Sequence, residues 1–121
     1  MAKLYEERKM FEFEWEGLIV IQPLNVQEIV NEGKELSHCV AGYAKRHASG
    51  KLHILFVRHK DAPDVPFYTM EVDLNGYIVQ CRGFRNDMTA PKDEHVIEFE
   101  KVYQKYLKII FKRKRKRGKS A

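Results

Sequence analysis

A histidine and a cysteine stand side by side at the predicted start of a helix. Ser37 is a suitable N-cap residue, so His38 and Cys39 would be the first two residues of that helix. The unpaired N–H groups and the positive end of the helix dipole both favour a thiolate at this position. We therefore consider Cys39 as a nucleophile, with either His38 or His47, two turns along the same helix, as its base.

The alternative is that Cys39 is a structural residue. Adjacent residues on a helix point about 100° apart, so His38 and Cys39 would not face each other. Cys39 instead shares a stripe with Tyr43 and His47, a spacing that also suits packing against a sheet, and free cysteine is most often a core residue. The histidines and cysteines match no recognised metal-ligand spacing, so we expect no metal and no cofactor.

A second candidate site lies on a predicted hairpin. Its strands run from Phe67 to Leu74 and from Tyr77 to Arg82, joined by Asn75-Gly76, which is a strong signal for a two-residue turn. This turn predicts the register of the whole hairpin, with these opposing pairs: Leu74 and Tyr77, Val72 and Val79, Glu71 and Gln80, Met70 and Cys81, Thr69 and Arg82.

The two faces of this hairpin differ in chemistry. The apolar face comprises Met70, Val72, Val79 and Cys81, so we expect Cys81 to be buried. The polar face comprises Thr69, Glu71, Gln80 and Arg82. Arg58, at the end of the preceding strand, could bring a guanidinium near Glu71. Carboxylate, amide and guanidinium groups would then form a polar recognition site on one sheet. The alternative is a solvated sheet face. In an enzyme, Glu71 would join His38 and Cys39 as a catalytic residue.

The elements that would position these residues form an α+β fold, with a mostly antiparallel sheet of about five strands and three helices. Phe11–Trp15 and Leu18–Ile21 predict a first hairpin around Glu16-Gly17, and residues 52–59 predict a central strand that is apolar on both faces. Asn25 caps a short helix that should start at Val26 and stop near Gly33. The remaining helices are predicted from Ser37 to Gly50, and from residues 89–91 onward as a long amphipathic helix.

Composition supports one domain with a basic extension. The chain has 121 residues and a formal charge of +5, and removing the seven basic residues of the extension leaves residues 1–111 at −2. We expect a single domain over residues 1–111 and a basic tail over residues 112–121.

The chain has no apolar run long enough to span a membrane and no signal-like N-terminus, and two cysteines are too few for a disulfide framework. These features predict a cytoplasmic protein without a membrane partner.

The basic tail is typical of an arm that contacts phosphates without reading sequence. Its charged block is Lys112, Arg113, Lys114, Arg115, Lys116 and Arg117. The alternative is a solubilising helix end, or in part an expression remnant. A block of like charges binds polyanions at low salt in either case.

Several blocks of sequence together resemble the PcfJ-like protein family, over about residues 28–100. The earlier blocks are Asn31 to Val40, Tyr43-Ala44, and Gly50-Lys51 with the run that ends at Arg58. The later blocks are residues 66–72 (PFYTMEV) and 78–86 (IVQCRGFRN), which resemble the family's P-x-x-T-x-E and Q-x-x-G-x-x-N patterns. The family's members are encoded on conjugative plasmids, phages and related mobile elements.

The resemblance implies an accessory protein that binds nucleic acid or a partner in DNA processing, because the founding member resembles a relaxosome accessory protein. It also favours a binding role for polar residues within the blocks, namely Tyr43, Arg58, Thr69, Gln80, Arg82 and Asn86. Two alternatives stay open. One is the Cys/His-dependent enzyme, and the other is an inhibitor that acts by binding a host defence complex.

Overall fold

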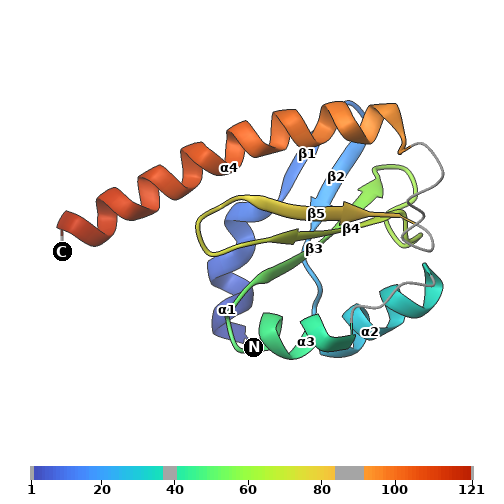
Figure 1. The fold of residues 1–121 in the computed structure, drawn as a ribbon, viewed down its shortest axis with the longest axis horizontal. Coiled ribbons are helices and arrows are strands. Elements are labelled where there is room, and N and C mark those ends of the chain that lie inside the picture. Colours follow the sequence, from blue (N-terminus) through green and yellow to red (C-terminus); the bar gives the residue numbers. More distant parts are fainter. Residues whose placement is uncertain (1, 37–40, 84–91, 121) are drawn as a thin grey trace.

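A five-stranded antiparallel sheet forms the middle layer of the structure (Figure 1). The computed structural model describes residues 2–36, 41–83 and 92–120. The strands lie in chain order: β1 (Phe13–Trp15), β2 (Leu18–Ile21), β3 (His53–His59), β4 (Tyr68–Val72) and β5 (Ile78–Arg82). The predicted α+β class is confirmed, and the strand predicted to be central lies in the middle of the sheet.

Helices cover both faces of the sheet (Figure 1). One face packs against α4 (Glu94–Ser120), and the other against α2 (Val26–Glu35) and α3 (Ala41–Ala48). Successive residues of β3 alternate between the two cores: Leu55 and Val57 belong to the α4 side, Ile54 and Phe56 to the α2 side. The chain begins with α1 (Ala2–Glu7), which continues into the 3-10 helix η1 (Arg8–Phe11). Neither α1 nor η1 was expected from the sequence.

Helix α2 begins as predicted and ends later than predicted. The side chain of Asn25 caps it, with Oδ1 accepting a hydrogen bond from the N–H of Glu28 at 3.0 Å. The expected stop near Gly33 is wrong, because Gly33 is buried inside the helix and its φ is not positive. The helix ends where the N–H of Leu36 donates to the carbonyl oxygen of Glu32. The two additional residues, Lys34 and Glu35, extend the helix beyond Glu32, whose carboxylate faces the sheet.

The second hairpin departs from the expected register near its turn. The pairs from Thr69–Arg82 to Glu71–Gln80 are confirmed, but Val72 pairs with Ile78, because a bulge lies between Glu71 and Val72. The carboxylate of Asp73 causes this change: its Oδ1 accepts hydrogen bonds from the N–H groups of Asn75 and Tyr77 and closes a longer turn.

The bulge changes which side chains reach the core beneath α4. Ile78 packs against that core, and Val79, which we expected on the apolar face, is 55% exposed. Cys81 is buried as predicted, and burial raises the pKa of its thiol above the ordinary value. The thiol of Cys81 therefore belongs to the core.

Helix α4 lies along the sheet and then extends past it (Figure 1). Asp93 caps the helix, with Oδ1 accepting from the N–H groups of His95 and Val96. Val96, Phe99 and Tyr103 of the predicted apolar stripe are buried, as are further residues up to Phe111. The helix continues through Ser120, so the basic segment is part of it, and the expected start at residues 89–91 lies outside the described residues. None of the described helices has the length and apolar character that crossing a membrane requires.

Gly76 lets the turn between β4 and β5 lie directly on α4. Its φ is +88°, and a Cβ at this position would lie 2.7 Å from Cγ of Phe111. We expect Gly76→Ala to lower the free energy of unfolding by about 2 kcal/mol, because backbone strain and overpacking act together. Gly17→Ala is the control, since Gly17 has φ +79° and nothing within 4 Å of the added Cβ. Urea denaturation showing equal losses in the two variants would rule out the contribution of Phe111.

Candidate functional site

The predicted nucleophilic site is described only in part. His38, Cys39 and Asn86 lie outside the described residues, so their proposed roles stay predictions. Tyr43 lies on α3 and packs, half-buried, against the core between α2, α3 and the sheet. The remaining predicted residues fall into three groups: a core cluster around His47, a polar cluster on the α2 side of the sheet, and the basic end of α4.

His47 is part of the core. Its side chain is 1% exposed, its Nδ1 accepts a hydrogen bond from the N–H of Ile54 at 2.8 Å, and its Nε2 lies 3.1 Å from Nη1 of Arg8. Burial lowers the pKa of His47 to about 3, and the charge of Arg8 adds to this effect. Both ring nitrogens are engaged in these contacts, and this argues against His47 as the base of a nucleophilic site.

Arg8 is the residue around which this core cluster is built. It is 2% exposed, and its Nε donates to Nδ1 of His53 at 2.9 Å. Its Nη2 donates to the carbonyl oxygens of His47 at 2.6 Å and Leu52 at 3.1 Å. Burial lowers the pKa of Arg8, and burial together with the charge of Arg8 lowers the pKa of His53 to about 4. The sequence offers no sign of this burial, because Arg8 stands in a charged run next to Glu7 and Lys9.

Arg58 forms a buried ion pair with Glu32 of α2. Nη1 and Nη2 of Arg58 donate to Oε2 and Oε1 of Glu32 at 2.5 and 2.6 Å, a two-pronged geometry that is among the strongest for charged groups. Nε donates to the carbonyl oxygen of Pro63 at 3.2 Å, and the guanidinium lies 4.6 Å from the ring centre of Phe56. Thr69 adds a hydroxyl that donates to Glu32 at 3.3 Å. The cluster joins α2 to the middle of the sheet.

The expected meeting of Arg58 and Glu71 does not occur. In the register of β3 and β4, Ile54 lies opposite Glu71, and Arg58 lies further along the strand, beyond the pair Phe56–Thr69. Sequence reasoning missed Glu32 as the partner of Arg58, because a carboxylate on a helix gives no local sign of which strand it will face.

Glu71 forms a separate polar pair with Gln80. Gln80 donates from Nε2 to Oε1 of Glu71 at 2.9 Å, and Glu71 is 8% exposed. The side chain of Arg82 is half-buried and, within the described part of the chain, makes no hydrogen bond or ion pair. Thr69, Glu71, Gln80 and Arg82 thus share the predicted polar face. The burial of Thr69 and Glu71 shows that this face is not an open, solvated surface.

Among the described residues, no cluster of carboxylates, histidines or cysteines could hold a metal ion.

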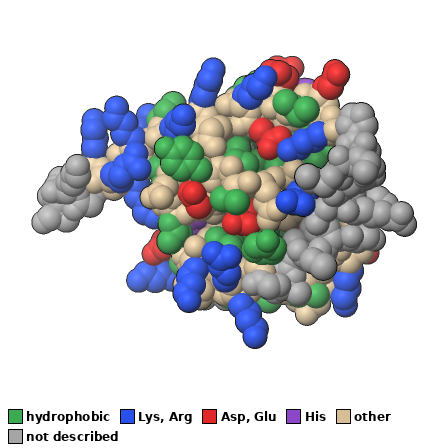
Figure 2. Space-filling view, viewed as in Figure 1, with side chains coloured by type: hydrophobic (Ala, Val, Ile, Leu, Met, Phe, Trp, Pro, Cys, Tyr) green, Lys and Arg blue, Asp and Glu red, His purple; other side chains and the backbone are tan. Residues whose placement is uncertain are grey.

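The basic end of α4 is the most exposed of the predicted sites. Lys112, Arg113, Lys114, Arg115 and Lys116 are all exposed, and Figure 2 shows blue side chains gathered around this part of the helix. Every charged side chain from Lys101 to the end of the sequence belongs to a lysine or an arginine. The helix therefore carries one sign of charge along the length that extends past the sheet.

The family match among the comparisons with known proteins covers the sheet and the start of α4 and ends before the basic segment of that helix. The model of the family described as "PcfJ-like protein" matches residues 1–98, which adds α1, η1 and the first hairpin to the region of resemblance. The chain is 40% identical over 84 residues to "Uncharacterized protein Lin1253/Lin1744" of Listeria innocua serovar 6a, a match that covers 68% of this chain and 18% of the relative. No solved structure matches. The chain belongs to the PcfJ-like protein family.

Proposed function

We propose that this chain is an accessory protein of a plasmid, phage or other mobile element, acts in the cytoplasm, and binds nucleic acid through the basic end of α4. The observation that supports the proposal is the position of Lys112–Lys116, which are exposed on a helix that extends past the sheet (Figure 1). The family context, in which the founding member resembles an accessory protein of DNA processing, points the same way.

Helical geometry suits this segment to a phosphate backbone. Consecutive residues of a helix are turned by about 100° and rise about 1.5 Å, so Lys112–Lys116 surround the helix axis within about 6 Å. Some cations therefore face a nucleic-acid strand in whichever direction it approaches. The remainder of the chain, residues 1–111, has a formal charge of −2, so the net positive charge of the molecule lies at this end.

Such a contact is expected to be independent of sequence. Lysine and arginine on phosphates position a protein on nucleic acid and do not distinguish bases. Most of the binding free energy would come from release of counterions, so the affinity should fall steeply as salt is added.

A charge-neutral variant of the helix end tests the proposal. We expect the substitutions Lys112→Gln, Arg113→Gln, Lys114→Gln and Arg115→Gln together to weaken binding to a DNA duplex at least about tenfold at low salt, because four phosphate contacts are lost. The measurement is fluorescence anisotropy with a labelled duplex.

The control variant removes as many exposed positive charges elsewhere, by Lys34→Gln, Lys45→Gln, Arg46→Gln and Lys51→Gln. Its affinity should stay within about twofold of the unmodified chain, since Lys34, Lys45 and Arg46 lie on α2 and α3, on the face of the sheet opposite α4, and Lys51 follows α3. Equal losses in the two variants would show that net charge alone drives binding and would contradict a site on α4.

A further inference from the structure

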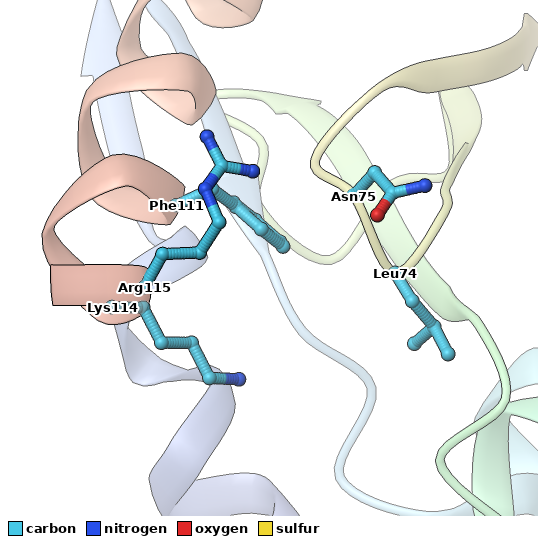
Figure 3. Close-up of a pocket in the computed structure, with 5 residues that line it drawn as sticks. All are labelled: Leu74, Asn75, Phe111, Lys114 and Arg115. Carbon is cyan, nitrogen blue, oxygen red and sulfur yellow. The ribbon is translucent and has the colours of Figure 1, made fainter. Parts of the chain in front are cut away.

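A pocket lies between the basic end of α4 and the turn that joins β4 to β5. Its volume is about 310 Å³, and it is lined by Leu74, Asn75, Phe111, Lys114 and Arg115. Figure 3 shows Phe111 and Arg115 extending from α4 and, across the pocket from them, Leu74 and Asn75 on the turn. The pocket is thus continuous with the cations to which we assign phosphate binding.

The wall of the pocket combines an apolar surface with one amide. The ring of Phe111 belongs to the core and is 5% exposed, and the backbone of Gly76 lies directly against it, so Phe111 forms the floor of the pocket. Leu74 is 55% exposed, and burial of this large apolar side chain by a ligand would contribute favourably to the binding free energy. The side-chain amide of Asn75 makes no hydrogen bond to any described residue, and it offers both a donor and an acceptor.

The charges at the pocket have one sign. Lys114 and Arg115 lie at its edge, and no carboxylate is among the lining residues. The nearby carboxylate of Asp73 accepts the backbone N–H groups of Asn75 and Tyr77, and these bonds hold it within the turn. An occupant should therefore carry a negative charge beside a flat or apolar group that fills the pocket.

We propose that this pocket holds an unpaired base of single-stranded nucleic acid, with its phosphates on Lys114 and Arg115. A base supplies an apolar face for Leu74 and Phe111 and a polar edge for the amide of Asn75. A duplex cannot place a base there without unpairing it. The inference rests on the proposed function and narrows it to a preference for single strands.

An acidic peptide with one apolar side chain is the competing occupant. Helical peptides bind through anchors spaced over two turns, which require a longer groove than a pocket of about 310 Å³. Lys112, Arg113 and Lys116 flank the two pocket cations on the same helix and add positive charge for the phosphates on either side of a bound nucleotide. Nucleic acid is therefore the occupant that the pocket and the helix end favour together.

Abasic DNA separates a contact with the base from a contact with phosphate. The probes are oligothymidine and oligouridine of about 12 nucleotides, an abasic strand of the same length, and a duplex. We expect the unmodified chain to bind the thymidine or uridine strand at least about fivefold more tightly than the abasic strand, as one stacked base would give. The ratio between oligothymidine and oligouridine reports the combined effect of the sugar and of the 5-methyl group that only thymine carries.

A variant of the pocket wall shows where the preference arises. Leu74→Ala with Asn75→Ala changes two exposed side chains and keeps every positive charge. It should bind the thymidine and abasic strands within about twofold of each other, with its affinity for the duplex unchanged. Leu24→Ala with Asn31→Ala removes the same side-chain types elsewhere on the surface and should keep the preference.

The inference fails if the unmodified chain does not distinguish the thymidine strand from the abasic strand, or if the pocket variant keeps the preference. It also fails if a peptide of aspartates around one tryptophan displaces the thymidine strand at lower concentration than unlabelled oligothymidine does. In these cases duplex binding through the helix end can persist. Loss of binding to all nucleic-acid probes, in contrast, would remove the proposed function itself.

Discussion

Replacing Arg58 with methionine is expected to lower the free energy of unfolding by about 3–5 kcal/mol, because it leaves the carboxylate of Glu32 buried without its cation. Glu32 and Arg58 are both buried, and their pair joins α2 to β3. After the substitution, the hydroxyl of Thr69 is the remaining side-chain donor to this carboxylate among the contacts described above. Urea denaturation followed by circular dichroism gives the change directly.

A double variant separates the effect of breaking the ion pair from the effect of changing side-chain volume. Glu32→Leu with Arg58→Met replaces both charges by apolar groups, and we expect it to recover most of the lost stability, since exchanging a complete buried pair is often neutral. Arg82→Met is the control, because the half-buried Arg82 makes no ion pair within the described ranges, and it should cost less than about 1 kcal/mol. A double variant as unstable as Arg58→Met alone would contradict a purely ionic cause.

Stability is also expected to fall as the pH drops below 6.5. The pKa of His47 is lowered from 6.5 to about 3 and that of His53 to about 4, so the unfolded chain binds protons that the folded chain excludes. Each histidine should therefore lower the free energy of unfolding by about 2 kcal/mol between about pH 7.5 and pH 5. Above about pH 7.5 the ring is neutral in both states, so neither histidine contributes to the pH dependence. Urea denaturation at a series of pH values measures this slope.

The environment of each ring explains the direction. Protonating His47 means adding a proton at Nδ1, where it now accepts the N–H of Ile54, and the new charge would lie beside Arg8. Burial has the largest effect on the pKa of His53 and lowers it. The charges of Arg8 and Lys114 lower this pKa further, and the charge of Asp73 raises it.

An asparagine variant tests the contribution of His53. His53→Asn keeps an acceptor for Arg8 but removes the titrating group, and it should reduce the slope by about half. An unchanged slope in His53→Asn would show that its ring does not titrate as described.

The parts of the fold that the sequence predicts are those with local causes. The cap at Asn25, the turn at Glu16-Gly17 and the apolar stripe of α4 depend on neighbours within a few residues. The register of the second hairpin was predicted correctly up to the point where the carboxylate of Asp73 closes a longer turn and shifts Val79 outward. A side chain that competes for backbone N–H groups is not visible in a simple alternation of polar and apolar residues.

The features that the sequence does not predict depend on contacts between distant residues. Arg8 meets His53 across 45 positions, and Glu32 meets Arg58 across 26. Arg58 was expected in a polar recognition site on the sheet, and nothing in the sequence near Arg8 indicates its burial, because most arginines are exposed. The candidate polar face was identified correctly as a set of residues, and the structure adds that Arg58 and Glu71 have separate partners there.

The salt dependence of duplex binding tests the proposed role of α4 most directly. If Lys112–Lys116 contact four to five phosphates, the plot of log affinity against log salt concentration should have a slope of about −4. The variant with Lys112→Gln, Arg113→Gln, Lys114→Gln and Arg115→Gln should reduce the slope to about −1, because Lys116 remains of the five cations. A shallow slope for the unmodified chain, or an equally steep one in the variant, would contradict phosphate binding by this helix end.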